Sequence, residues 1–298
     1  MSPTATEPTR VDFPSSGGVR VAAYRWDPEG EPRAVVQLTH GMGEHALRYA
    51  DLARALNARG YVVYAQDHRG HGATATSPED LGRLGPGGWP EVVGDIDRLR
   101  LRAREGHPGV PFVLLGHSMG SFAVQQYLLD HSADLDAVVL TGTAAIDLLE
   151  PALDLEAPMD LSAFNAPFEP ARTEYDWLSR DPAQVDAYVE DPLCGFGLDS
   201  DGGKAMFLGS HEVARHERLE SLRRDLPVYV AVGEHDPVNA RLTLVDALVD
   251  RLRTAGLEDV TLKVYPEARH EVFNETNRDE VVADLIKWLD TRVLGVVT

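Results

Sequence analysis

Residues 112–120 read Phe112-Val113-Leu114-Leu115-Gly116-His117-Ser118-Met119-Gly120, an apolar β-type run followed by the pattern Gly-x-Ser-x-Gly. The segment after it, residues 121–130, is compatible with a helix. Strand, sharp turn and helix form the context of a nucleophile elbow, which exposes one side chain at the carboxyl end of a strand. Glycines on either side relieve crowding at such a strained turn. The pattern predicts Ser118 as a nucleophile, although an inert serine in a tight turn would produce the same sequence pattern.

Apolar β-type runs and helical patterns alternate along most of the chain. Strands are predicted at 34–38, 61–65, 112–115, 137–140, 228–232 and 261–265, and helices at 45–59, 89–104, 121–130, 241–254 and 279–293. An antiparallel hairpin is predicted ahead of them, from the runs 11–13 and 19–26. Such alternation predicts an α/β fold, with a mostly parallel central sheet flanked by helices on both faces.

The alternation stops between residues 146 and 210, where Pro, Asp and short helical pieces dominate. We therefore expect residues 1–145 and 211–298 to form the core and residues 146–210 to form an inserted, mainly helical cap. Residues 147–201 carry fourteen Asp and Glu against Arg172 and Arg180, a net charge of −12. We expect the carboxylates of this segment to face water and its large apolar residues to face a pocket.

Charge and cysteine content narrow the choice of partners and compartment. The 298 residues contain 28 Lys and Arg against 48 Asp and Glu, a net charge of −20, which argues against a nucleic-acid partner. The single cysteine, Cys194, excludes an intramolecular disulfide and fits a cytoplasmic protein. We expect Cys194 to be a small, partly buried cap residue rather than a reactive thiol. Residues 1–10 lack the pattern of a signal peptide, no segment is expected to insert stably into a membrane, and the sequence carries no signal for an oligomeric state.

A serine nucleophile needs a base and a third group that orients the base. Asp236 follows the strand 228–232, and His270 follows the strand 261–265. Because the carboxyl ends of parallel strands meet at one edge of a sheet, we expect both residues to lie near Ser118. The order Ser118, Asp236, His270 is that of α/β-hydrolases. Asp67 is a rival for the third role, although an ion pair with Arg69 is the favoured interpretation for it.

An oxyanion hole needs two convergent N–H donors. We expect one from Met119, directly after the nucleophile, and one from Met42, in the glycine-containing loop after the strand 34–38. The residues expected to support these loops are His40, Gly41, Gly116, His117 and Gly120.

Five motifs together resemble the monoacylglycerol lipase and lysophospholipase-like family of α/β-hydrolases. They are His40-Gly41-Met42-Gly43-Glu44-His45, Asp67-His68-Arg69-Gly70-His71-Gly72, Gly116-His117-Ser118-Met119-Gly120, Gly233-Glu234-His235-Asp236-Pro237-Val238 and His270-Glu271-Val272-Phe273-Asn274-Glu275. The resemblance implies the α/β-hydrolase fold, hydrolysis of carboxylic esters by the triad of Ser118, Asp236 and His270, and a cap over the acyl pocket. Ala46-Leu47 and Thr74 depart from the residues that the family often carries. Neither belongs to the triad, and both are expected to affect loop packing near the pocket.

The function expected from these features is serine ester hydrolysis without a cofactor, acting on a small lipid or ester, most specifically a monoacylglycerol. A lysophospholipase or broad carboxylesterase is the alternative enzyme, and a catalytically silent binding protein on the same scaffold is the alternative class. Several loops contain histidines, and His68 and His71 would form the start of a metal site if they shared a helix face. No cysteine or convergent carboxylate set accompanies them in the sequence, so no metal is predicted. Asp95 and Asp97, on a predicted helix, are expected to be solvated.

Overall fold

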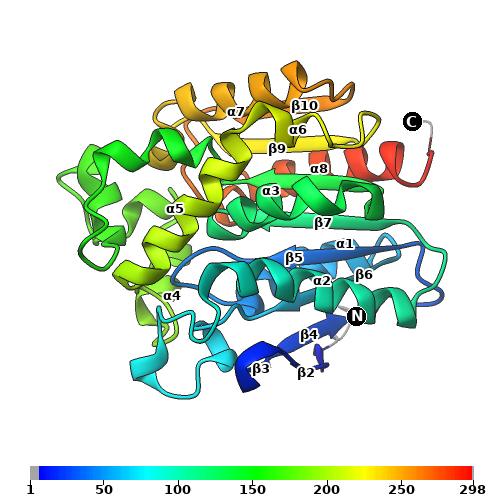
Figure 1. The fold of residues 1–298 in the computed structure, drawn as a ribbon, viewed down its shortest axis with the longest axis horizontal. Helices are drawn as coiled ribbons and strands as arrows, with labels where there is room; N and C mark the ends of the chain where they lie inside the picture. The colour runs from blue at the N-terminus through cyan, green and yellow to red at the C-terminus, as the bar shows by residue number, and fades with distance from the viewer. Residues whose placement is uncertain (1–6, 297–298) are drawn as a thin grey trace.

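The protein is built around an eight-stranded sheet in the order β1-β4-β6-β5-β7-β8-β9-β10 (Figure 1). This computed structural model describes residues 7–296. The strands are β1 (Thr9–Arg10), β4 (Ala23–Trp26), β5 (Ala34–Thr39), β6 (Tyr61–Gln66), β7 (Phe112–His117), β8 (Ala137–Thr141), β9 (Val228–Gly233) and β10 (Val260–Tyr265). Neighbours from β6 through to β10 pair in parallel, whereas β4 pairs antiparallel with β6 and with β1. The predicted mostly parallel sheet is confirmed.

The predicted hairpin forms, but as two short ladders rather than one. Its tip is β2 (Phe13–Pro14) paired with β3 (Arg20–Val21), and its base is β1 paired with β4. Gly17 and Gly18 in the connecting turn both have positive φ, which a glycine adopts without a steric penalty.

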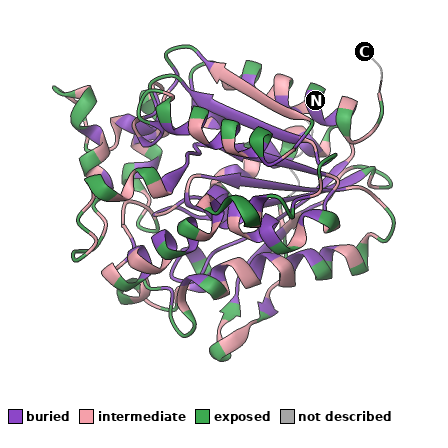
Figure 2. Cartoon of the chain, turned by 45° about the horizontal axis from the view of Figure 1, so that its top comes forward, coloured by how far each residue is buried: buried purple, intermediate pink, exposed green. Residues whose placement is uncertain are grey.

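Helices cover both faces of the sheet, as predicted (Figures 1 and 2). The helices α2 (Gly88–Gly106), α3 (Met119–His131) and α7 (Thr243–Thr254) contribute to one apolar cluster, and α1 (Ala50–Asn57) and α8 (Arg278–Arg292) contribute to the other. The central strands β5 and β7 are buried along their whole length, which is why they read as continuous apolar runs.

The predicted helix over residues 45–59 begins later than expected. Residues Ala46–Tyr49 form a 3₁₀ turn, and α1 begins at Ala50. The cause is a competing partner for the backbone, because the N–H of Ala46 donates to the Asp67 carboxylate at 2.8 Å. The chain is thereby fixed in an extended conformation at His45 before it can enter the helix.

The segment after β8 consists of 3₁₀ turns and the helices α4 (Pro182–Glu190) and α5 (Ser200–Ala214). Asp181 and Asp199 cap the two helices through backbone N–H groups of their first turns. Helix α5 continues past residue 210 and packs against α2 and α3. It therefore ties the segment to the core. The boundary between core and cap at residues 145/146 and 210/211 stays a prediction.

Within residues 7–296, no helix combines the length and the apolarity needed to cross a bilayer. One expectation about α2 is wrong. Asp95 is 1% exposed rather than solvated, because its carboxylate accepts a hydrogen bond from the buried Arg69 at 2.8 Å. Asp97, by contrast, is only partly buried.

Candidate active site

Ser118 occupies the turn between β7 and α3, with φ 50° and ψ −124°. This left-handed conformation is unusual for a residue with a side chain and is the strained geometry that the sequence motif predicts. The flanking glycines are required by space. A Cβ on Gly116 would lie 2.7 Å from the Cα of Ser121, and one on Gly120 would lie 2.3 Å from the carbonyl oxygen of Thr39. The strand β7 and helix α3 can therefore approach closely enough to hold the turn.

His270 and Asp236 lie together at the carboxyl ends of β10 and β9. The Nδ1 atom of His270 is 2.9 Å from Oδ1 of Asp236, and both side chains are buried. Oδ1 of Asp236 also accepts the N–H of Val238 at 2.9 Å. The Nε2 atom of His270 has no hydrogen-bond partner among the described residues. With Nδ1 donating to Asp236, this Nε2 carries a lone pair available to a substrate or nucleophile.

Burial and charge act in opposite directions on His270. Burial opposes protonation of the ring, but the negative charge and hydrogen bond of Asp236 outweigh it and raise the pKa of His270 above its usual value. His117, whose ring lies 4.8 Å from that of His270, has its pKa held well below the usual range, first by burial and then by the neighbouring His270. His117 is thus a neutral neighbour, and it contacts Thr141 through Nδ1 at 3.0 Å.

The cap segment reaches the same histidine. The ring of Trp177 lies 4.8 Å from that of His270. The backbone of the histidine loop is bonded to the cap, because the N–H of His270 donates to Trp177 at 3.4 Å and that of Glu271 donates to Leu178 at 2.8 Å. The ring of His270 is therefore positioned by the cap as well as by Asp236.

The loop after β5 lies beside Ser118, as predicted. Gly41 and Met42 line the same pocket as Ser118, Met119 and His270. His40, which is fully buried, braces this loop by donating from Nδ1 to the carbonyl of Gly41 at 2.8 Å. Met119 is the first residue of α3, so its N–H has no acceptor one helical turn earlier. All predicted site residues come to one edge of the sheet.

The pocket above Ser118 is lined mainly by apolar side chains from the core and the cap. These are Met42, Met119, Phe122, Ile146, Leu149, Leu153, Met159, Leu161, Phe164, Trp177, Leu178, Met206, Phe207 and Val238. Polar groups line it too, namely His117, Glu44, Glu271 and Tyr188. The hydroxyl of Tyr188 is buried and has no hydrogen-bond partner among the described residues.

The two carboxylates of the pocket share one arginine, which the sequence analysis missed. Arg48 donates from Nη1 to Glu44 at 2.7 Å and to Glu271 at 2.6 Å, and from Nη2 to Glu271 at 2.8 Å. Its guanidinium lies over the ring of Tyr188, 4.8 Å from the centroid. Glu44 in turn accepts the N–H of Gly41 at 2.5 Å. This cluster, Glu44, Arg48, Glu271 and Tyr188, is called the carboxylate–arginine cluster below.

The pKa values of the two carboxyl groups in this cluster are shifted in opposite directions. Burial favours the neutral form of Glu271, but Arg48 overcomes it and lowers the pKa of that carboxyl to about 2. For Glu44, burial prevails over the attraction of Arg48 and raises the pKa. In the sequence, the carboxylate–arginine cluster is indicated only by the spacing of four residues between Glu44 and Arg48 and by the position of Glu271 next to His270.

Asp67 is not a partner of Arg69, so that interpretation was wrong. Its carboxylate accepts the N–H groups of Ala46 and Ala73, each at 2.8 Å, while Arg69 pairs with Asp95. Asp67 therefore fixes two loops. His68 and His71 are buried in loop structure rather than on a shared helix face. Burial lowers the pKa of His68 to about 3 and that of His71 to about 4.

Comparison with known proteins places the chain in a family. A family model described as "Serine aminopeptidase, S33" matches residues 30–277. The chain belongs to this family. It is 36% identical over 283 residues to a monoacylglycerol lipase of Mycolicibacterium smegmatis, covering 93% of this chain and 95% of that protein. It is 28% identical over 274 residues to the monoglyceride lipase of Homo sapiens, covering 90% and 86%.

Solved structures agree in fold. A thermostable carboxyl esterase from Bacillus coagulans, in complex with glycerol, matches with a TM-score of 0.85 at 31% identity and covers 97% of this chain and 99% of that one. A soluble variant of monoglyceride lipase from Saccharomyces cerevisiae, in complex with a substrate analog, matches with a TM-score of 0.78 at 21% identity, covering 98% and 97%. The predicted α/β-hydrolase fold and the resemblance to monoacylglycerol lipases are confirmed.

Proposed function

We propose that this protein hydrolyses monoacylglycerols, releasing a fatty acid and glycerol through an acyl-enzyme. Relatives of similar length include a monoacylglycerol lipase and a monoglyceride lipase, and the similar carboxyl esterase of Bacillus coagulans was solved in complex with glycerol. The observation that carries the proposal is the make-up of the pocket, which combines a long apolar lining with one polar cluster beside Ser118. Such a pocket is complementary to an ester with an apolar acid and a small polar alcohol.

In the proposed reaction, Ser118 Oγ attacks the ester carbonyl while its proton moves to Nε2 of His270. Asp236 holds the ring in the required tautomer and stabilises the imidazolium. The N–H groups of Met42 and Met119 stabilise the oxyanion, at about 3 kcal/mol each. The tetrahedral intermediate then expels the alcohol, which takes the proton from His270. Water, deprotonated by His270, attacks the acyl-enzyme, and the fatty acid leaves as Ser118 is restored.

The carboxylate–arginine cluster favours glycerol over a phosphate-bearing headgroup. Arg48 is the cation of this cluster, and its Nη1 and Nη2 groups already donate to Glu44 and Glu271. An incoming phosphodiester would find no free cation in this cluster, because the charge of Arg48 is already balanced by the ionised Glu271. Glycerol hydroxyls can instead donate to these carboxylates, and the unpartnered hydroxyl of Tyr188 offers one more bonding group. This argues against the lysophospholipase alternative.

The test compares 1-monoacylglycerols of increasing acyl length with lysophosphatidylcholine and with p-nitrophenyl esters of the same acids. We expect monoacylglycerol kcat/KM to exceed that for the matched lysophospholipid at every chain length, and Ser118→Ala to abolish turnover and labelling by a fluorophosphonate. A preference for the lysophospholipid would refute the alcohol assignment. Failure of wild-type Ser118 to label would refute the enzyme itself and favour the binding-protein alternative. We also propose a cytoplasmic location, because the single thiol is only partly buried and forms no disulfide.

A further inference from the structure

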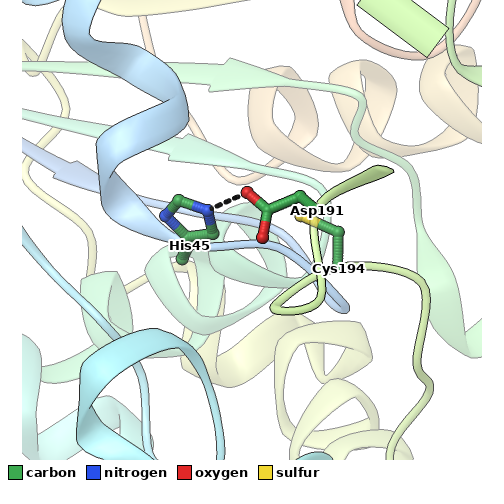
Figure 3. A group of neighbouring side chains, drawn as sticks. All are labelled: His45, Asp191 and Cys194. Atoms are coloured by element: carbon green, nitrogen blue, oxygen red, sulfur yellow. Dashed lines mark hydrogen bonds and ion pairs between the residues drawn. The ribbon is translucent and has the colours of Figure 1, made fainter. Parts of the chain in front are cut away.

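Three groups able to bind a metal lie together outside the substrate pocket (Figure 3). A ring nitrogen of His45, a carboxylate oxygen of Asp191 and Sγ of Cys194 all lie within 4.8 Å of one another. His45 ends the loop that carries Met42, whereas Asp191 and Cys194 belong to the turn after α4 in the cap. None of the three lines the pocket, and the proposed reaction uses none of them. The group therefore calls for a separate explanation.

The turn of the cap presents two of the groups on one side. Oδ1 of Asp191 accepts the N–H of Leu193 at 2.8 Å, and the N–H of Cys194 donates to the carbonyl of Asp191 at 3.0 Å. These bonds leave Oδ2 of Asp191 to point at Nε2 of His45, 2.9 Å away. Two residues separate Asp191 from Cys194, which is the ligand spacing found within the turns of structural zinc sites.

Backbone contacts hold this turn against the loop of His45. The N–H of Gly195 donates to the carbonyl of Gly43 at 3.0 Å. A Cβ on Gly43 would lie 2.3 Å from the carbonyl oxygen of Phe196, so the two segments are in direct contact. The ligands are thus brought together by the folded chain before any ion arrives, which reduces the ordering that binding requires.

Acidic side chains outnumber cations around the three groups. Asp191 pairs with His45 at 2.9 Å, and the nearby Arg48 is already paired with both Glu44 and Glu271. When a divalent ion binds the sulfur, the S–H bond breaks and its proton passes to solvent.

We propose that His45, Asp191 and Cys194 bind one Zn²⁺ ion, with water completing a four-coordinate site. Nitrogen, oxygen and sulfur are the ligand types that zinc prefers, and tetrahedral bonds of ordinary length would separate the ligand atoms by about 3.3–3.5 Å. The present atoms lie within 4.8 Å of one another, so binding would draw them closer together. The ion would tie the cap to the loop of Met42, and would act as a tether between them rather than as part of the proposed reaction.

The sequence predicted no metal because no cysteine or carboxylate accompanied the histidines. The fold supplies both to His45 from residues more than 140 positions later. A second cluster, Asp97, His131 and Asp134, also brings three such groups within 4.8 Å. It lacks a thiol, and Arg100 already pairs with both carboxylates, at 2.8 and 3.3 Å. That second cluster serves as an internal control.

The experiment measures binding of Zn²⁺ and of Co²⁺ to the purified, chelator-treated full chain. We expect one equivalent of Zn²⁺ by isothermal titration calorimetry, and with Co²⁺ a sulfur-to-metal charge-transfer band in the near ultraviolet. Cys194→Ser should remove the band, and His45→Ala, Asp191→Asn and Cys194→Ser should each weaken Zn²⁺ binding at least about tenfold. His131→Gln, in the control cluster, should leave the affinity and the band unchanged.

Three results would overturn the proposal. These are a wild-type protein that binds no Zn²⁺, a Co²⁺ complex without the thiolate band, and an affinity that falls with His131→Gln but not with Cys194→Ser. Circular dichroism spectra of each variant exclude unfolding as a cause of lost binding. A tether also predicts that Zn²⁺ raises the Tm of wild type but not that of Cys194→Ser. This readout does not depend on the substrate, so it separates the metal site from the proposed function.

Discussion

Replacing Asp236 by Asn tests the orientation of His270 most sharply. In the wild type, one carboxylate oxygen accepts both from Nδ1 of His270 and from the N–H of Val238, each at 2.9 Å. An Asn side chain can keep its oxygen there but loses the negative charge that stabilises the imidazolium. If the side-chain amide flips, its NH₂ group faces Nδ1 and stabilises the tautomer with the proton on Nε2. In that tautomer Nε2 cannot accept the proton of Ser118.

The first outcome weakens the base and the second removes it, so we expect kcat to fall about 10⁴-fold, as in other serine hydrolases where the triad acid becomes an amide. At 1.36 kcal/mol per decade this corresponds to about 5 kcal/mol of transition-state stabilisation. The assay is steady-state hydrolysis of a soluble p-nitrophenyl ester, with Tm measured on the same preparations.

Asp67→Asn is the matched control, because Asp67 is equally buried and, like Asp236, accepts two N–H donors, in its case both from the backbone. It should lower Tm by loosening two loops while kcat stays within about tenfold of wild type. An Asp236→Asn enzyme that keeps a tenth or more of wild-type kcat, with Asp67→Asn inactive yet folded, would refute the assignment of Asp236.

Four further predictions follow from the charges of the structure. Because Asp236 raises the pKa of His270, kcat/KM should fall with decreasing pH, with a midpoint above the ordinary histidine pKa of about 6.5. A midpoint well below that value would contradict this prediction. The lowered pKa values of His68 and His71 mean that below pH 6.5 the unfolded chain binds protons that the native state does not. The unfolding free energy from urea titration should therefore fall by about 1.5 kcal/mol per histidine between pH 6.5 and 5. His71→Gln should flatten that dependence, and an unchanged slope in this variant would contradict the prediction. Arg48→Met leaves two buried carboxylates without their cation and should cost about 3–5 kcal/mol of stability. In the double variant, Glu271→Gln should restore part of that loss. Additive losses would show that Arg48 and Glu271 are not coupled. The net charge of −12 over residues 147–201 should make the enzyme bind anionic vesicles more weakly than neutral ones at low salt, and the reverse order in co-sedimentation would refute this.

The sequence predicted the parts of the fold that depend on local pattern. Continuous apolar runs identified the parallel strands because both faces of those strands are buried, as in β5 and β7. The glycines of the elbow predicted a turn whose close contacts leave no room for a Cβ, and the structure has those contacts at Gly116 and Gly120. The predicted site residues follow the ends of strands, and parallel pairing brings such ends to one edge.

The features that were missed depend on which distant residues meet. Nothing in the sequence sets Arg48 apart within the predicted helix over residues 45–59, but it lies between Glu44 and Glu271, a carboxylate 223 residues away in sequence. Asp95 was expected in solvent because helical spacing places it near Arg98, yet Arg69 from a separate loop covers it. Hydrophobic periodicity predicts which face of a helix packs against the core. It does not predict which charged side chains from distant segments contact that helix.

The contacts of the cap indicate that it helps to position His270, the candidate base. Residues Trp177 and Leu178 accept hydrogen bonds from the backbone of the His270 loop, and Arg180 pairs with the fully buried Glu275 of that loop at 2.9 Å. The turn after α4 meets the loop of Met42 in the same way, through Gly195. A movement of the cap would therefore shift the surroundings of both the proton acceptor and the oxyanion donors. Because misplacing catalytic groups by about 1 Å is enough to cost roughly a hundredfold in rate, access to the pocket and assembly of the site should be coupled in this enzyme rather than independent.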